Sequence, residues 1–286
     1  MISSKTSFLA LIGNPVKHSL SPIMHNAAIN YLGLDLVYLA IPCKNKDFEI
    51  VINSLKKINC KGLNITIPFK EKVIDHCDEI TPIAKKIKAV NTLKLNDQNQ
   101  WIGTNTDVIG LIHPLKKLNF NRKLGIVLGS GGASRSAIQG LIELKTSNII
   151  IISRNTEKRE KLIKDFEGES LIKGLAFDDH TTFEYIHNSD LIINTTPVGM
   201  VKENYDNQEL PFGSIFWKSL NSKTIVYDLI YNPSSTALLK FSQKKGCKTI
   251  NGTEMLIAQG IESLAFWTDG RRAPFNIMED ALKTYI

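Results

Sequence analysis

The stretch GIVLGSGGASRSAI at residues 125–138 decides how the middle of this chain folds. Its apolar start is typical of a buried strand, the glycines Gly129, Gly131 and Gly132 follow at once, and small residues then open a helix. Glycine allows a tight turn, and its missing Cβ lets a large anion approach the backbone amides at a helix N-terminus. A strand, a glycine turn, a helix and a second strand within about thirty residues favour a dinucleotide site over an ordinary structural turn.

Two details refine this hypothesis. The third glycine position of the fingerprint holds Ser134, and the absence of a G-K-[ST] sequence argues against a nucleoside-triphosphate loop. The next strand ends in Ser153, Arg154 and Asn155, where an NAD site usually carries an acid. A cation there suits a 2′-phosphate, so Arg154 favours NADP, although a surface arginine at a helix start would look the same; Arg159, one turn further on, could assist.

Composition excludes several other classes of protein. The chain has 286 residues, enough for two domains, and no apolar run approaches the roughly 18 residues that span a bilayer. The net charge of +7 comes from dispersed lysines without an arginine-rich block, which favours a solvated surface over nucleic-acid binding. The four cysteines have no zinc-like spacing, so we expect no metal site. The N-terminal apolar stretch is too short for a secretory signal, and a cytoplasmic location is expected.

Strand and helix patterns alternate along the chain, which predicts an α/β fold with right-handed crossovers. The predicted strands are 7–12, 35–41, 62–67, 89–95, 124–128, 148–153, 189–194, 223–229 and 247–250. The predicted helices include 22–32, 46–58, 108–118, 133–145, 156–165 and 234–244, and a long amphipathic helix follows residue 251. The polar segment 94–107 is predicted to be a hairpin turn and a passage between domains.

The stretch GLNITIPFKEK at residues 62–72 carries a second signal. Strand alternation places Asn64 and Thr66 on one face, and Pro68 ends the ladder. Lys70 is then expected near the first turn of a helix, where the helix dipole disfavours a cation. This mismatch hints at a functional lysine, although a solvated surface lysine remains an alternative.

Other polar residues stand out in apolar surroundings. Asp107 could cap a helix that begins at Val108, or it could present its carboxylate to Lys70. Asn91 interrupts an apolar strand. Ser19 and Ser21 lie two residues apart before Pro22; a helix start explains them, yet two hydroxyls there could also hold a carboxylate.

These stretches occur together in the order of a known family. GNPVKHSLSPIMHNAA, NITIPFK, AVNTL, GTNTDVIG, GSGGASR, NTTPVGM, YDLIYNP and GTEMLIAQG cover the chain from about residue 8 to about 280. The sequence resembles the shikimate dehydrogenase family. The resemblance implies reversible reduction of 3-dehydroshikimate to shikimate with NADPH, in aromatic and chorismate biosynthesis.

The resemblance also implies a fold and a division of the chain. A substrate domain of residues 1–107 and 251–286 would flank a Rossmann-type NADP domain of residues 108–250, with a cleft between them. The protein would be a monomer or a homodimer that binds a small molecule, with no membrane or nucleic-acid partner. The polar stretch 201–213 would be either a mobile cover or an ordinary surface loop.

Site residues carry over from the family motifs by position. Lys70 matches the catalytic lysine and Asp107 its partner. The residues that match substrate contacts are Ser19, Ser21, Asn64, Thr66, Asn91, Tyr231 and Gln259, and Asp107 also matches a contact to the ring hydroxyls. The residues that match cofactor contacts are Gly129, Ser130, Gly131, Gly132, Ala133, Ser153, Arg154, Asn155, Thr195, Pro197, Gly199, Leu229 and Gly252. Ser153-Arg154-Asn155 departs from the Asn-Arg-Thr that the family often has; Arg154 is kept, so NADP remains favoured, but the departure leaves the strength of that preference open.

Two rival functions use the same fold. A quinate or shikimate dehydrogenase that uses NAD is disfavoured by Arg154. A ligand-sensing relative without catalysis would be expected to lack Lys70 or Asp107, and both are present.

Overall fold

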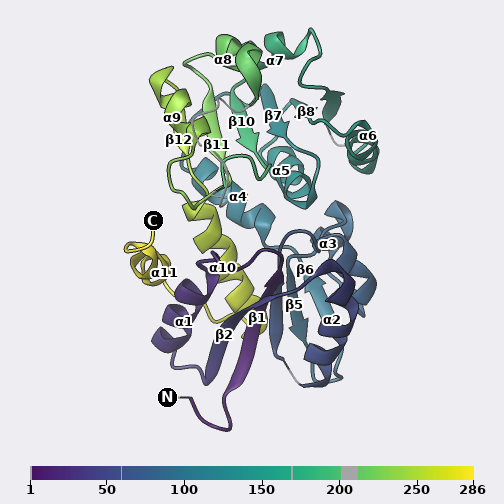
Figure 1. The fold of residues 1–286 in the computed structure, drawn as a ribbon, viewed down its shortest axis with the longest axis vertical. Coiled ribbons are helices and arrows are strands. Elements are labelled where there is room, and N and C mark those ends of the chain that lie inside the picture. Colours follow the sequence, from purple (N-terminus) through teal and green to yellow (C-terminus); the bar gives the residue numbers. More distant parts are fainter. Residues whose placement is uncertain (1, 59, 169, 201–211) are drawn as a thin grey trace. The chain divides into compact units, whose positions relative to one another are not determined.

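A computed structural model describes residues 2–58, 60–168, 170–200 and 212–286. The chain forms two compact units (Figure 1): the first comprises Met1–Gly110 and Leu256–Tyr285, and the second comprises Leu111–Met255 and the terminal Ile286. Each unit contains a six-stranded sheet with helices, so the predicted α/β class is confirmed. The division predicted from the sequence, at 107/108 and 250/251, stays a prediction.

The sheet of the first unit is mixed. Its strand order is β2-β1-β3-β5-β6-β4, with β1 parallel to both β2 and β3, and β5 antiparallel to β3 and β6. The β5–β6 pair forms the hairpin expected at 94–107. The strands are β1 Ser7–Gly13, β2 Leu36–Pro42, β3 Gly62–Ile65, β4 Glu79–Ile80, β5 Thr92–Leu95 and β6 Trp101–Thr104. Strand β4 escaped prediction because two residues are too few to establish a period, and β6 because it lies in the polar segment 94–107 that was assigned to a turn.

Helices surround this sheet. They are α1 Ser21–Tyr31, α2 Phe48–Lys57, α3 Pro82–Ile87 and α11 Phe275–Leu282, with 3₁₀ helices η1 Asn45–Asp47 and η2 Lys72–His76. Helices α1 and α11 lie side by side (Figure 1). The core includes Phe48 and Phe69, whose rings stack at 4.2 Å between centroids. Because Phe69 is fully buried, it fixes the backbone next to Lys70.

Helix α1 closes the exposed edge of the sheet. Strand β2 is an edge strand, and Asn26 of α1 supplies both partners that a neighbouring strand would offer. The Asn26 Nδ2 donates to the Tyr38 carbonyl at 2.9 Å, and the Tyr38 N–H donates to the Asn26 Oδ1 at 2.8 Å. Covered edges resist pairing with other chains, and the same two bonds fix α1 against β2.

His25 belongs to the same helix, and its side chain is buried. Its ring stacks on Tyr38 with centroids 4.3 Å apart, and neither ring nitrogen has a hydrogen-bond partner among the described residues. Burial lowers the pKa of His25 to about 3, so the imidazole is neutral at physiological pH.

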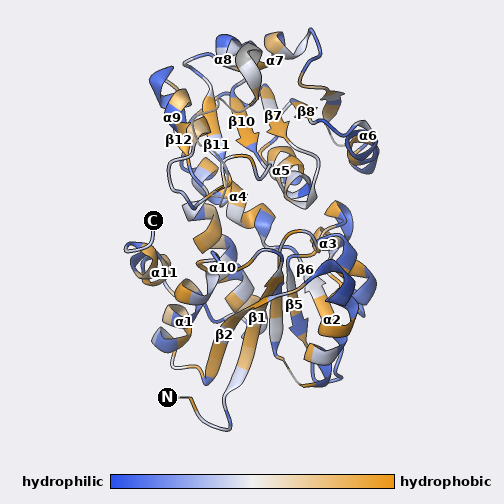
Figure 2. Ribbon diagram, viewed as in Figure 1, coloured by the Kyte–Doolittle hydropathy of each residue, from blue (hydrophilic) through white to orange (hydrophobic). Residues whose placement is uncertain are grey.

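The second unit has an entirely parallel sheet. The strand order β12-β11-β10-β7-β8-β9 is that of a Rossmann-type fold, with the order reversing between β7 and β10. Its strands are β7 Leu124–Leu128, β8 Asn148–Ile152, β9 Leu171–Leu175, β10 Leu191–Asn194, β11 Ile225–Asp228 and β12 Lys248–Ile250. Figure 2 shows β7, β10 and β11 mostly in orange, as expected for strands covered on both faces. Strand β9, which Lys173 and Gly174 interrupt, was not predicted.

Helices connect these strands. They are α5 Gly132–Glu143, α6 Thr156–Asp165, α7 Thr182–Asn188, α8 Gly213–Ser219 and α9 Ala237–Lys244. Helices α4 (Asp107–Lys116) and α10 (Thr253–Trp267) each contain a boundary between the two units. A buried ion pair of 2.7 Å between Arg135 and Asp165 ties α5 to α6. Within the described ranges, no helix is long and apolar enough to cross a membrane.

Candidate active site

Lys70 and Asp107 form an ion pair in the first unit. The Lys70 Nζ lies 2.6 Å from the Asp107 Oδ2, and the two side chains are 15% and 6% exposed. Lys70 lies in a turn ahead of η2 rather than in the first turn of an α-helix, and its carbonyl accepts the Val90 N–H at 2.8 Å. The backbone on both sides of the lysine is thereby fixed, and the ammonium is directed at a carboxylate.

The Asp107 carboxylate accepts hydrogen bonds on both oxygens. Asp107 begins α4, and its Oδ1 accepts from the Asn91 Nδ2 at 2.8 Å. The Thr106 N–H can only donate, and it donates to the Asn91 Oδ1 at 2.8 Å. This bond fixes the orientation of the Asn91 amide, so the Asn91 NH₂ faces the Asp107 carboxylate. An ionised Asp107 therefore holds Lys70 and Asn91 and keeps lone pairs for a further donor.

Asn64 is held by an equally definite pattern. Its Nδ2 faces the main-chain oxygen of Asn91 at 3.3 Å, which can only accept. Its Oδ1 accordingly accepts from the Tyr38 hydroxyl at 2.7 Å. The same amide nitrogen also reaches the Ser263 Oγ at 3.0 Å. Asn64, Asn91 and Asp107 are all buried, so this polar cluster is rigid and nearly dry.

Ser19 and Ser21 lie together at the start of α1. The Ser19 Oγ is 3.1 Å from the Ser21 Oγ and accepts the Ser21 N–H at 3.2 Å. Leu20 occupies the N-cap position, so Ser21 is the first residue of the helix. Thr66 is half-buried and lies one residue beyond β3, which ends at Ile65 and not at residue 67 as predicted.

Gln259 joins the same cluster from α10. Its Nε2 donates to the Leu256 carbonyl at 2.7 Å, so its Oε1 faces the Thr106 hydroxyl at 3.5 Å. The first unit thus brings Lys70, Asn91, Asp107, Asn64 and Gln259 into one continuous network.

The glycine loop of the second unit follows β7 at the point where the strand order reverses. Gly129 has a φ of +117°, which residues with a Cβ rarely adopt. Ser134 replaces the third glycine for a local reason: its fully buried hydroxyl accepts the Gly131 N–H at 3.1 Å and lies 2.7 Å from the Thr195 Oγ1. The serine therefore ties the loop to the end of β10.

Gly131 fits an anion site. Its φ of −100° suits any residue, and a Cβ added there would meet nothing within 4 Å. Local folding therefore does not require a glycine, and its missing side chain leaves open space in front of α5. The first amides of α5, at Gly132 and Ala133, belong to the group that has no partner within a helix. Together with Ser130, these residues fit a pyrophosphate.

The turn after β8 presents Arg154 at the surface. Ser153 is buried, whereas Arg154 and Asn155 are exposed. Asn155 caps α6, with its side chain accepting the Lys158 N–H at 2.8 Å. Arg159 is buried and donates to the Ser153 carbonyl at 2.7 Å, so it supports the turn from below instead of assisting Arg154 directly.

The loops after β10 and β11 share a buried carboxylate that sequence reasoning missed. Asp228 accepts from the Asn194 Nδ2 at 3.0 Å and from the Thr236 hydroxyl at 2.6 Å. Burial raises the pKa of Asp228 to about 6, against the lowering effect of these hydrogen bonds. Polar residues at the ends of neighbouring parallel strands were the available signal.

Those loops carry the remaining cofactor candidates. Asn194 also accepts the Thr196 N–H at 3.0 Å, which shapes the loop that contains Thr195, Pro197 and Gly199. A Cβ on Gly252 would overlap the Leu229 carbonyl, so the backbone there approaches closer than any other residue permits. Tyr231 is half-buried and belongs to the second unit. Residues 201–211, most of the stretch considered as a cover, lie outside the described residues.

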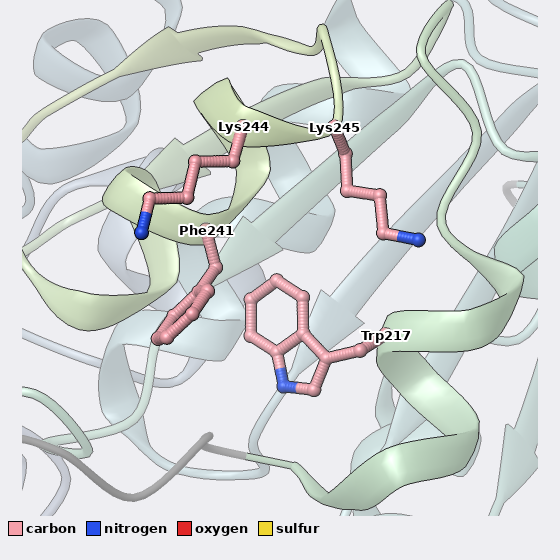
Figure 3. A pocket seen from close by; sticks show the side chains of 4 residues that line it. All are labelled: Trp217, Phe241, Lys244 and Lys245. Atoms are coloured by element: carbon pink, nitrogen blue, oxygen red, sulfur yellow. The ribbon is translucent and has the colours of Figure 1, made fainter.

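A shallow hollow elsewhere in the second unit contains none of the predicted residues. Figure 3 shows its lining: Trp217 of α8, with Phe241, Lys244 and Lys245 at the end of α9. Trp217 and Phe241 belong to or pack against the core, and the Lys244 Nζ lies 5.2 Å from the Phe241 ring centroid. The hollow forms where aromatic packing meets surface lysines.

Family models match three stretches of the chain. Residues 11–93 match the shikimate dehydrogenase substrate binding domain, residues 114–202 match shikimate / quinate 5-dehydrogenase, and residues 252–283 match the shikimate 5'-dehydrogenase C-terminal domain.

Individual proteins agree with these matches. The chain is 65% identical over 286 residues, all of both chains, to a Prochlorococcus marinus subsp. pastoris protein named shikimate dehydrogenase (NADP(+)). It is similar to the crystal structure of shikimate dehydrogenase from Aquifex aeolicus, with a TM-score of 0.87 and 35% identity over 99% of this chain and 100% of that chain. A shikimate dehydrogenase solved with NADP+ has a TM-score of 0.86 and 38% identity over 100% of this chain and 98% of the other. With such identity across its whole length, the chain belongs to the shikimate dehydrogenase family.

Proposed function

We propose that this protein interconverts shikimate and 3-dehydroshikimate with NADP as the cofactor, a step of aromatic and chorismate biosynthesis. The observation that carries the proposal is the Lys70–Asp107 ion pair, which is embedded in a buried cluster of amides and hydroxyls within a chain of this family. The enzyme is an NADP-dependent oxidoreductase that acts on a CH–OH group. A cytoplasmic location and a monomeric or homodimeric state belong to this proposal.

The substrate is a carboxylated, hydroxylated ring, and the first unit offers a partner for each kind of group. Ser19 and Ser21 would hold the carboxylate, because two hydroxyls lie beside the N-terminus of α1. The ring hydroxyls would bond Thr66 and the rigid cluster of Asn64, Asn91, Asp107 and Gln259. Tyr231 would contribute from the second unit.

Residues of the second unit would bind the groups of the cofactor. The amides from Gly129 to Ala133 would bind the pyrophosphate, and Ser153, Arg154 and Asn155 would meet the 2′-phosphate. Thr195, Pro197, Gly199, Leu229 and Gly252 would line the nicotinamide end. When bound, NADPH supplies the hydride.

Proton transfer to and from the substrate oxygen would be carried out by the protein's own residues. As the ketone is reduced, negative charge develops on its oxygen, and the Lys70 ammonium would stabilise that charge and donate a proton. In the reverse direction, the lysine would take the proton from the hydroxyl. Asp107, with Asn91 on its other oxygen, would fix the ammonium and accept from a ring hydroxyl.

The first test measures NADPH formed from shikimate and NADP+ by the purified protein. We expect formation with this pair at a kcat/KM well above that with NAD+ or with quinate. A protein that binds both ligands and forms no NADPH would be a silent relative, and a preference for NAD+ and quinate would favour the other rival.

The second test replaces Lys70 by alanine. Loss of the proton donor should lower kcat by roughly 10²- to 10⁴-fold, while KM for shikimate changes far less. Lys72→Ala is the matched control, because Lys72 is an exposed lysine two residues away whose Nζ lies 3.4 Å from the Asn45 carbonyl and 5.2 Å from the Phe48 ring centroid. Equal losses in rate and affinity for Lys70→Ala would restrict the lysine to binding.

A further inference from the structure

Three hydroxyls form a closed cluster inside the first unit. The Ser263 Oγ lies 2.9 Å from the Thr92 Oγ1 and 3.1 Å from the Thr106 Oγ1, and the two threonine oxygens are 3.4 Å apart. Ser263 and Thr92 are fully buried and Thr106 is 4% exposed. The residues matched to family roles include none of these three.

Ser263 connects the amides of the cluster. Its hydroxyl oxygen faces the Asn64 Nδ2, which donates at 3.0 Å, so the single Ser263 proton is available to Thr106 or Thr92. Thr106 accepts from the Asn91 Nδ2 at 3.0 Å and faces Gln259. Ser263 therefore adds a hydroxyl link between Asn64 and Thr106, beside the bonds that the Asn64 Nδ2 donates to the Asn91 carbonyl at 3.3 Å and to the Thr92 Oγ1 at 3.1 Å.

The position of Ser263 on α10 suits this task. Gln259 and Ser263 are four residues apart on one helix, so their side chains lie on the same face. A single helix therefore carries both the amide that is proposed to meet the substrate and the hydroxyl that links this amide's neighbours.

We propose that Ser263, together with Thr92, is a positioning residue for substrate reduction. This inference rests on the proposed function, because Asn64, Asn91 and Gln259 are the groups proposed to hold the ring hydroxyls. Without the Ser263 hydroxyl, the Asn64 amide loses its shortest acceptor and keeps only the Asn91 carbonyl and the Thr92 Oγ1, and both threonine hydroxyls lose a partner. The amides are then held by fewer hydrogen bonds, and the reacting carbon–oxygen bond is less firmly positioned.

The test compares Ser263→Ala and Thr92→Val with a matched control. Thr92→Val keeps the shape of the side chain and removes the hydroxyl. Ser242→Ala is the control, since Ser242 is equally buried, lies on α9 of the second unit and donates to the Leu238 carbonyl at 2.7 Å. Both site variants should lower kcat/KM for shikimate by roughly 10- to 100-fold, with KM for NADP+ within about twofold of the wild type.

The controls separate positioning from folding. Ser242→Ala should cost thermal stability like Ser263→Ala while kcat/KM for shikimate stays within about twofold, and Thr92→Ser, which keeps the hydroxyl, should recover most of the activity lost in Thr92→Val. If circular dichroism shows that Ser263→Ala does not fold, the activity of Thr92→Val tests the inference instead. Wild-type kcat/KM in a folded Ser263→Ala or Thr92→Val overturns the inference, whereas a wild-type protein inactive on shikimate overturns the proposed function instead.

Discussion

Asp228 shows how one buried carboxyl group links two loops and makes stability depend on pH. Its folded-state pKa is raised to about 6 from 3.8, so the stability it contributes is complete below pH 3.8 and is lost as pH rises through 6. The difference across this window is about 3 kcal/mol.

We expect Asp228→Asn to remove this pH dependence. The asparagine keeps an oxygen for Asn194, and the Thr236 hydroxyl can turn to accept from the new amide. Urea unfolding at pH 4 and pH 7 should show the wild type losing about 2 kcal/mol more than the variant on going to pH 7. Parallel pH profiles for the two proteins would contradict the assignment.

His25 should make folding stability depend on pH in the opposite direction, with stability lost as pH falls. Its folded-state pKa is lowered to about 3 from 6.5, so its contribution to stability is present above pH 6.5 and is lost as pH falls. His25→Phe keeps a ring against Tyr38 and cannot be protonated. Between pH 6.5 and 4.5 the wild type should lose about 2 kcal/mol of unfolding free energy that the variant retains. The same loss in both proteins would place the titrating group elsewhere.

At the scale of elements, α1 both covers an edge strand and presents the serines proposed to hold the substrate carboxylate. Removal of the Asn26 side chain leaves the Tyr38 N–H and C=O without these partners and loosens α1 from β2. We expect Asn26→Ala to cost about 2 kcal/mol of unfolding free energy and to raise KM for shikimate more than KM for NADP+.

Asn53→Ala on α2 is the control for Asn26→Ala, because it makes the same change at an exposed position of another helix. Light scattering should also reveal association of the Asn26 variant through the opened edge. Equal stability of the two variants would show that the edge does not depend on Asn26.

At the scale of the whole molecule, each unit should respond to its own ligand. Shikimate and NADP+, added separately at about 100 times their dissociation constants, should each stabilise the folded protein by about 2.7 kcal/mol, seen as a rise in melting temperature. Lys70→Ala should keep the NADP+ response. Duplex DNA at physiological salt should cause no shift, because the lysines are dispersed; stabilisation by DNA would restore the nucleic-acid alternative.

Local pattern was sufficient for the long elements and insufficient for the short ones. The strand, glycine turn and helix at 125–138 were predicted because an apolar run, the glycines that permit a tight turn and the small residues that start a helix all lie within one stretch. Strand β4 was missed because two residues show no period, β6 because it lies in the polar segment assigned to a turn, and β9 because Lys173 and Gly174 interrupt its apolar pattern. The roles of Ser134 and Arg159 also depended on contacts that only the folded chain provides.

The sequence by itself determined the α/β class and the family, and it supplied the set of polar residues proposed to carry the chemistry, because these depend on residue type and local spacing. Only the tertiary structure decided which of these residues meet: Lys70 with Asp107 across 37 positions, and Asn64 with Ser263 across 199. Hydrogen bonds and burial depend on where atoms lie in space. A contact between residues that are far apart in the chain produces no periodic pattern in the sequence.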